Sequence, residues 1–194
     1  MMKNTHPTKE KVIQAAGTLF YQKGYHATSV RDIAKEAKVN ISLISYYFDG
    51  KQGLFETIVI DHLEANLKLL EESQGEHFLT IVKKILHYKM DNYQLSCFVH
   101  REMMLDSTLL RELLVTYIAK EDSLWASILF QADDISDLRY GQELQLLQMK
   151  GMLQAPFTVP WYQRGERSSA EAKRYFIDKY VENMRQWFKG DPVE

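Results

Sequence analysis

The chain has almost no cysteine, because Cys97 is the only one in 194 residues. A single thiol excludes an intrachain disulfide and a cysteine metal cluster, and it suits a reducing compartment. The opening residues, M-M-K-N-T-H-P, lack the apolar core of a signal peptide, and no apolar run approaches the length that spans a membrane. We therefore expect a cytoplasmic protein.

Signals of catalysis are also lacking. The sequence contains no glycine-rich phosphate loop, no serine in a nucleophile elbow and no obvious pair of catalytic acids. Its histidines have no ligand spacing along the chain; His87 and His100 could meet across neighbouring helices, but lone histidines in a core or on a surface explain them more simply. We expect no catalytic residue, no metal site and no cofactor.

The third absence is of β-structure. No segment has a convincing strand pattern, and there is neither an internal repeat nor a low-complexity tract. Apolar residues instead recur at helical spacing along nearly the whole chain. With 45% hydrophobic residues, 194 residues can form a small domain and a larger one. We predict an all-α protein with a three-helix head in residues 1–50 and a helical-bundle body in residues 51–194.

The helical pattern gives approximate bounds for each element. Pro156, Pro160 and Gly165 are expected to force an extended loop, after which Ser168 and Glu171 form a capping box for the last helix. Gly24 is expected to end the first helix in a left-handed conformation. The predicted helices begin at Thr5 or Thr8 and run to Lys23, and then cover about 28–37, 40–48, 51–72, 77–91, 93–105, 108–130, 142–154 and 168–189.

Residues 28–51 contain two short helical patterns, and too few residues separate them for anything but a tight corner. Thr28 is expected to cap the first helix, and Asn40 to cap the second. Lys38 and Val39 form the corner. This is the pattern of a helix-turn-helix, in which the second helix enters the major groove of DNA.

The second helix of this pair has two faces. Ile41, Ile44 and Phe48 recur at helical spacing and are expected to point into the core. Hydroxyls and aromatic rings remain on the outer face, where they can meet base edges, thymine methyls and phosphates. The outward residues are Ser42, Leu43, Ser45, Tyr46 and Tyr47.

Charge is distributed unevenly along the chain. Residues 1–51 hold eight basic and four acidic residues, a net charge of +4, so the overall charge of −2 leaves −6 for the rest. A basic head on an acidic body fits a protein whose head faces phosphates, although ordinary scatter of surface charge is the alternative. We therefore expect the protein to associate with the nucleoid.

Phosphate contacts are expected around the helix-turn-helix. Lys51 begins a long helix, where free amides and the positive end of the helix dipole favour an anion. We predict that Lys51, Tyr47 and Arg31 hold the DNA backbone. Ser42, Leu43, Ser45 and Tyr46 are predicted to face bases, and Asn40 completes the predicted DNA-binding set.

These residues resemble the DNA-binding segment of the TetR family of transcriptional regulators. The resemblance runs from Thr8 to about Leu54. Two positions depart from it: Lys38 stands where the family often has a glycine in the turn, and Ser45 stands where the family commonly has a third aromatic residue. It implies a regulator that binds a palindromic DNA site as a homodimer. The motifs are A-A-x-x-L-F-x-x-K-G-Y (15–25), T-S-V-R-D-I-A (28–34), Tyr46-Tyr47-Phe48 and Lys51.

The last two predicted helices have broader apolar faces than one core needs. The surplus predicts an interface, most simply a four-helix bundle built by two copies about a twofold axis. TetR-like proteins dimerise through such helices, which would present recognition helices to half-sites about 35 Å apart. The alternative is a final helix buried in its own body. The predicted interface residues are Leu144, Leu147, Ile177, Tyr180, Val181, Met184, Trp187 and Phe188.

The body leaves two partner classes open. Methionines and aromatic residues in its middle helices could line a small-molecule effector pocket, as in TetR-like proteins, but core packing is the more common explanation. Arg101, Glu102, Arg111 and Glu112 form either a solvated face with weak ion pairs or a surface for a protein partner. The segments I-S-Y-Y-F-x-G-K-x-G-L, Q-L-x-x-F-V-x-R-E and D-S-T-L-x-R-E resemble RefZ-type TetR-like regulators of spore-forming bacteria, which implies a division partner such as FtsZ.

Overall fold

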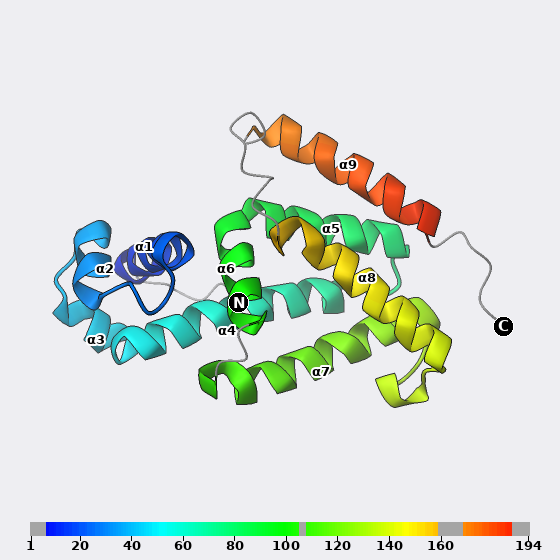
Figure 1. Ribbon diagram of the computed structural model, residues 1–194, viewed down its shortest axis with the longest axis horizontal. Helices are drawn as coiled ribbons and strands as arrows, with labels where there is room; N and C mark the ends of the chain where they lie inside the picture. The colour runs from blue at the N-terminus through cyan, green and yellow to red at the C-terminus, as the bar shows by residue number, and fades with distance from the viewer. Residues whose placement is uncertain (1–6, 105–107, 159–168, 188–194) are drawn as a thin grey trace. The chain divides into compact units, whose positions relative to one another are not determined.

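The computed structural model describes residues 7–104, 108–158 and 169–187, with the backbone alone for 108–113 and 187 (Figure 1). The chain divides into two compact units, the first made of residues 1–63 and 94–105 and the second of residues 64–93 and 106–194. Within the described ranges every regular element is a helix, which confirms the all-α prediction. None of the described helices is long and apolar enough to cross a membrane.

The helices follow the sequence pattern closely. Helix α4 passes from the first unit into the second, and α6 brings the chain back to the first. The first compact unit therefore includes residues beyond 50. The division of the chain into a DNA-binding head (1–50) and a body (51–194) is a functional boundary, and it stays a prediction. The elements are α1 (Pro7–Lys23), α2 (Val30–Ala37), α3 (Ser42–Phe48), α4 (Gly50–Glu72), α5 (Phe78–Asp91), α6 (Tyr93–Met104), α7 (Thr108–Phe130), the 3-10 turn η1 (Ile135–Asp137), α8 (Tyr140–Thr158) and α9 (Ala170–Trp187).

The loop between α1 and α2 corrects one prediction. Gly24 has φ +85°, as expected for a left-handed helix end, but Thr28 does not cap α2. Its side chain is buried and donates a hydrogen bond to the Gly24 carbonyl at 2.8 Å. Ser29 is the cap instead, because its Oγ accepts from the Asp32 amide and the Asp32 carboxylate accepts from the Ser29 amide, each at 3.1 Å. This reciprocal pair satisfies amides that would otherwise be free at the start of α2.

The corner between α2 and α3 forms largely as the sequence predicts. Lys38 is left-handed, with φ 55°, and its amide donates to carbonyls near the end of α2. The Asn40 side chain accepts from the Ser42 amide at 3.0 Å, so it caps the first turn of α3. Ile44 and Phe48 are buried as predicted. The prediction for Ile41 was wrong: its side chain is 44% exposed, because it lies at the helix end and its Cβ tilts beyond that end.

A second tight corner joins α3 to α4. Asp49 and Gly50 both have positive φ, 56° and 96°, which turns the chain within two residues. Gly53 then packs directly on the end of α3: a Cβ built there would lie 1.9 Å from the Phe48 carbonyl oxygen. Only glycine fits this contact, so the direction of α4 relative to α3 depends on residue 53.

Aromatic rings from α1, α4 and α6 form the core of the first unit. Phe20 stacks on Phe98 with ring centroids 5.4 Å apart, and Phe55 packs edge-on to Phe98 at 5.7 Å. Tyr25 joins them, 4.6 Å from Phe55. These rings hold α6, which is distant in sequence, against the helices of the head.

In the second unit, α9 packs along α5, and α8 packs on α7 (Figure 1). Helix α8 continues through Pro156 to Thr158, so the prediction that an extended loop starts at Pro156 was wrong; the rest of the predicted loop lies outside the described residues. Proline has no amide proton to donate to the carbonyl four residues earlier, at Met152. The Tyr180 hydroxyl of α9 donates to that carbonyl at 2.7 Å and replaces the missing helical bond. Ser169 caps α9; Ser168, the predicted cap, lies outside the described residues.

Candidate nucleic-acid interface

Helix α3 presents a compact exposed face. Ile41, Ser42, Ser45 and Tyr46 are all exposed and occupy positions i, i+1, i+4 and i+5 of one helix surface. Tyr46 is 79% exposed, which is unusual for a large aromatic side chain. Leu43 and Tyr47 are half-buried at the edges.

Two polar residues at the start of this face, Asn40 and Ser42, are hydrogen-bonded to each other. The Ser42 hydroxyl donates to Asn40 Oδ1 at 2.9 Å, and the Ser42 amide donates to the same oxygen at 3.0 Å. The Asn40 amide nitrogen keeps its two donor protons, and the Ser42 hydroxyl keeps its acceptor lone pairs. The rings of Tyr46 and Tyr47 meet edge to face with centroids 5.0 Å apart.

Lys51 makes contacts that its sequence position did not indicate. Its Nζ donates to the Tyr25 carbonyl at 3.1 Å and to the Thr28 carbonyl at 3.0 Å, and it lies 4.2 Å from the centroid of the Tyr25 ring. It therefore ties the loop between α1 and α2 to the start of α4. An ammonium group has three donor protons, so one remains for a phosphate oxygen.

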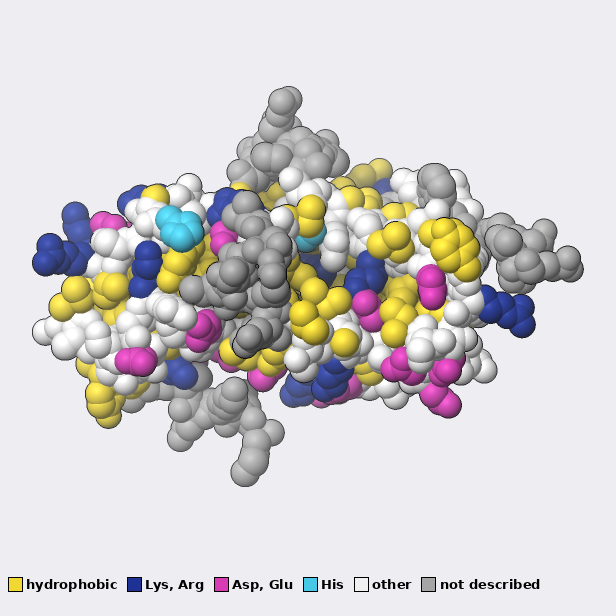
Figure 2. Space-filling model, turned by 60° about the horizontal axis from the view of Figure 1, so that its bottom comes forward, with side chains coloured by type: hydrophobic (Ala, Val, Ile, Leu, Met, Phe, Trp, Pro, Cys, Tyr) yellow, Lys and Arg dark blue, Asp and Glu magenta, His cyan; other side chains and the backbone are white. Residues whose placement is uncertain are grey.

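The unit that contains α3 also carries basic side chains on α1 and α2. Arg31 is exposed in the first turn of α2, and Lys9 Nζ lies 5.5 Å from the Phe48 ring centroid at the end of α3. Figure 2 shows Lys and Arg side chains protruding at the end of the first unit that carries α2 and α3. The positive charge that the sequence places in residues 1–51 is therefore carried by the same unit as the exposed face of α3.

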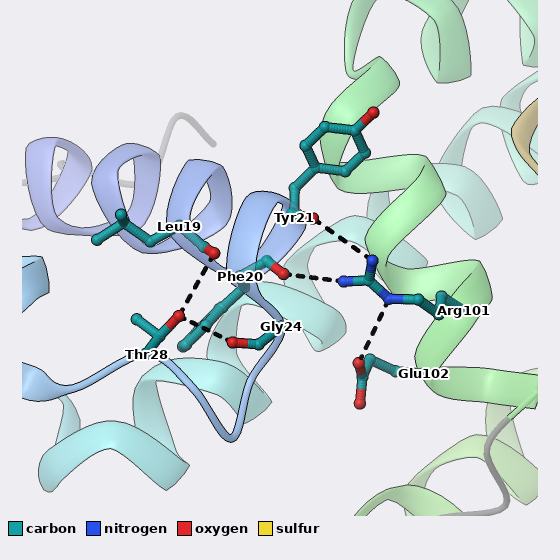
Figure 3. Close-up of polar contacts among 7 residues, drawn as sticks. All are labelled: Leu19, Phe20, Tyr21, Gly24, Thr28, Arg101 and Glu102. Atoms are coloured by element: carbon teal, nitrogen blue, oxygen red, sulfur yellow. Dashed lines mark hydrogen bonds and ion pairs between the residues drawn. The ribbon is translucent and has the colours of Figure 1, made fainter. Parts of the chain in front are cut away.

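Arg101 connects α6 to the end of α1 (Figure 3). Its guanidinium donates to the Phe20 carbonyl at 2.9 Å and to the Tyr21 carbonyl at 3.4 Å, so a cation occupies the negative end of the α1 dipole. The Glu102 carboxylate lies 3.9 Å from Arg101 Nε. No local pattern could have indicated this contact, because 80 residues separate Arg101 from Tyr21.

The contacts of Arg101 and Glu102 bear on the predicted partner surface. Glu102 is only 7% exposed, which does not fit an exposed docking surface. Burial raises the pKa of its carboxyl, and the charges of Arg101 and His26 oppose that rise. The side chains of Arg111 and Glu112 lie outside those that the structure describes.

The predicted dimer residues divide by helix. On α8, Leu144 is 41% exposed and Leu147 is 67% exposed, and they continue a stripe that starts at Tyr140. On α9, Ile177 and Met184 are buried within their own unit, whereas Tyr180 and Val181 are half-buried. The side chains of Trp187 and Phe188 lie outside the described set. Of the predicted dimer residues that the structure describes, those that are exposed therefore lie on α8, and α9 packs on α5.

The interior of the second unit contains polar groups as well as apolar ones. Asn66 Nδ2 donates to Glu121 Oε1 at 3.0 Å, and Lys150 Nζ pairs with Glu121 and Asp122. Asn66 Oδ1 is buried without a partner in the described residues. Burial lowers the pKa of Lys89, an effect that the charge of Glu121 opposes. Apolar packing accounts for Met90 and Trp125 in this unit, as predicted. In the first unit Phe98 is buried as predicted, whereas Met104 is 74% exposed. The described residues contain no group of three His, Cys, Asp or Glu side chains that could hold a metal ion.

A helix-turn-helix with an exposed face, in a part of the chain with a net positive charge, defines a DNA-binding regulatory protein. Residues 12–58 match the family model of bacterial regulatory proteins of the tetR family. A relative from Bacillus subtilis, a probable HTH-type transcriptional regulator called YttP, is 38% identical over 192 residues and covers 94% of this chain and 93% of its own. The chain therefore belongs to the TetR family of transcriptional regulators.

Other relatives support the same family. The biofilm operon negative regulator IcaR of Staphylococcus aureus is 31% identical over 81 residues, which cover 40% of this chain and 43% of IcaR. A TetR-family protein from Rhodococcus has a TM-score of 0.73 at 16% identity, covering 94% of this chain and 97% of its own, and a regulator from Aquifex aeolicus has a TM-score of 0.73 at 19% identity, covering 93% and 99%. The relatives support the family and not the RefZ type specifically. The family is not enzymatic, in agreement with the sequence.

Proposed function

We propose that this protein binds a palindromic DNA site as a homodimer and represses transcription from it, as the name of IcaR states for that relative. The observation that carries the proposal is the exposed face of α3, with Tyr46 79% in solvent beside exposed serine hydroxyls. An exposed patch that combines an aromatic ring and an isoleucine with hydroxyls on one helix face is the kind of surface that marks an interaction site. Such a protein would act in the cytoplasm, on the nucleoid.

Each predicted DNA contact has a role in this proposal. Arg31, Tyr47 and Lys51 bind phosphates, which gives affinity and register without sequence information. Ser42, Leu43, Ser45 and Tyr46 face the bases, and Asn40 can donate from its amide to an acceptor at the groove edge. The exposed Leu144 and Leu147 of α8 support dimerisation, because an apolar stripe on a helix is stabilised by a second copy of itself.

The polar groups inside the second unit bear on whether the second partner is a small-molecule effector or another protein. Asn66 Oδ1 needs a donor, and Lys89 and Lys150 lie near the acidic groups of α7. A small polar effector with a donor group would satisfy this oxygen, which supports effector control. A cell-division partner such as FtsZ, docking on the surface of Arg101, Glu102, Arg111 and Glu112, is less well supported because Glu102 is buried.

The test starts from selection of duplexes from a random pool with the full-length protein. We expect an enriched palindrome, and we expect Tyr46→Ala to lose about 1–3 kcal/mol of preference at one base pair of each half-site. Binding to random duplexes should change little. Equal losses of affinity on specific and random DNA would contradict the base-facing role of Tyr46. Mapping of bound chromosomal sites would separate the two partner classes: one promoter supports a repressor, and a few regularly placed sites support a positional role.

A further inference from the structure

Ile41 is an apolar side chain on a face that is otherwise polar. The sequence pattern places it in the core with Ile44, yet it is 44% exposed while Ile44 is fully buried. Its neighbours on the exposed face are Ser42, Ser45 and Tyr46, each with a hydroxyl. A branched hydrocarbon in water between these residues contributes little to the stability of the unit.

The position of Ile41 is fixed by the residues around it. Its carbonyl accepts from the Ile44 amide at 3.1 Å, and its backbone is helical, with φ −56° and ψ −33°. Asn40 and Ser42, on either side, are bonded to each other. A β-branched side chain also has few rotamers, so its methyl groups are held in place before any contact forms.

The location of Ile41 matches the part of a recognition helix that contacts bases. In helix-turn-helix proteins the first residues of the second helix reach the base edges. The major groove offers mainly hydrogen-bond donors and acceptors, and its apolar group is the C5-methyl of thymine. A serine hydroxyl can donate or accept and so tolerates several bases, whereas an isoleucine gains only from the methyl group.

We propose that Ile41 contacts the C5-methyl group of a thymine in each half-site and thereby selects a T·A pair at that position. This inference rests on the proposed DNA binding, and it adds a specificity-determining residue to the predicted set. The structure assigns this contact to Ile41 and not to Leu43, because the Leu43 side chain is half-buried, whereas the Ile41 side chain is exposed at the helix end.

The experiment removes one methyl group at a time. In the palindrome selected by the full-length protein, each thymine is replaced singly by deoxyuridine, which pairs identically but lacks the C5-methyl. Dissociation constants are measured for the unaltered protein, Ile41→Ala, Ile41→Thr and the matched variant Leu43→Ala. Far-UV circular dichroism and thermal melting verify the fold of each variant. Ile41→Thr keeps the β-branched shape and serves in place of Ile41→Ala if the alanine variant melts early.

At one thymine of a half-site we expect deoxyuridine to weaken binding of the unaltered protein by about fourfold, the contribution of one buried methyl group. Ile41→Ala should show no such loss at that thymine, and Leu43→Ala should keep it. A uracil effect that persists in Ile41→Ala, or that disappears only in Leu43→Ala, would overturn the inference while leaving DNA binding intact. Failure to select any duplex would instead reject the proposed function itself.

Discussion

Lys51 contacts two backbone carbonyls and keeps one donor proton. The two carbonyls belong to Tyr25 and Thr28, so the side chain orders the loop before α2, and its third proton remains for the proposed phosphate contact. Its effect on DNA binding can thus be direct, through a phosphate, or indirect, through the loop. Salt dependence distinguishes the two, because only a direct contact releases a counterion.

We predict that Lys51→Ala weakens binding to every duplex and reduces the slope of log K against log salt by about 0.9, the value for one phosphate. Titration at several salt concentrations measures this slope. Lys68→Ala is the matched control on the same helix, since Lys68 is 69% exposed and pairs with Glu72. Weaker binding with an unchanged slope would limit Lys51 to ordering the loop.

Asp32 gives the head a dependence on pH. Hydrogen bonds from the Ser29 side chain and then the Ser29 backbone hold the pKa of the Asp32 carboxyl below its ordinary range. A lowered pKa in the folded state stabilises the fold above the ordinary carboxyl pKa, and this contribution is lost as pH falls through the folded value. We predict that Asp32→Ala lowers the melting temperature at neutral pH and that the difference disappears in acid. Melting of both proteins across pH measures it; a difference that persists unchanged in acid would argue against this role of the carboxylate.

At the scale of the elements, the corner between α3 and α4 depends on Gly53 having no side chain. We predict that Gly53→Ala destabilises the protein by at least about 2 kcal/mol, because a Cβ at 1.9 Å from the Phe48 carbonyl oxygen forces the backbone to move. Urea unfolding measures the loss. Gly17→Ala in α1 is the control: nothing lies within 4 Å of its Cβ position, and alanine favours a helix by about 1 kcal/mol. Equal stability of the two variants would refute the close approach.

The contact of α6 with α1 depends on one side chain. We predict that Arg101→Ala lowers the free energy of unfolding by about 1 kcal/mol, because the Phe20 carbonyl loses a charged donor but keeps the Gly24 amide. Arg101→Lys should recover part of this loss, since a lysine keeps the charge without the paired donors. Lys179→Ala removes an exposed pair with Glu182 and should change little. Identical unfolding curves for Arg101→Ala and Lys179→Ala would show that the α1 contact adds nothing.

For the whole molecule, the exposed stripe of α8 is the proposed basis of dimerisation. We predict that Leu147→Glu yields a monomer, because a charge on a 67% exposed apolar position would be buried by the second copy. Sedimentation measures the mass, and gel shifts compare a full palindrome with a half-site. Val115→Glu changes an equally exposed valine of α7, 63% in solvent, and should remain a dimer. A dimer for Leu147→Glu would place the interface elsewhere.

Local patterns determined most of the elements. Helical spacing gave nine helices within a few residues of their observed bounds, and the motifs from Ala15 to Lys51 gave the family. Such features succeed because periodicity and caps act over a few neighbouring residues. One error reflects a distant group, because the Tyr180 hydroxyl replaces the helical bond that Pro156 cannot make. The exposure of Ile41 is instead a local effect of its place at the end of α3.

The amino-acid sequence by itself determined that this protein is all-α and carries a helix-turn-helix with a basic head, because those properties depend on spacing and composition. Only the tertiary structure decided which side chains are free to bind. Glu102 and Lys51 look alike in sequence as exposed charges, yet one is buried and the other is engaged with two carbonyls. The physical reason is that burial and hydrogen bonding depend on residues far apart in the chain, such as Arg101 and Phe20, which meet only when the helices pack.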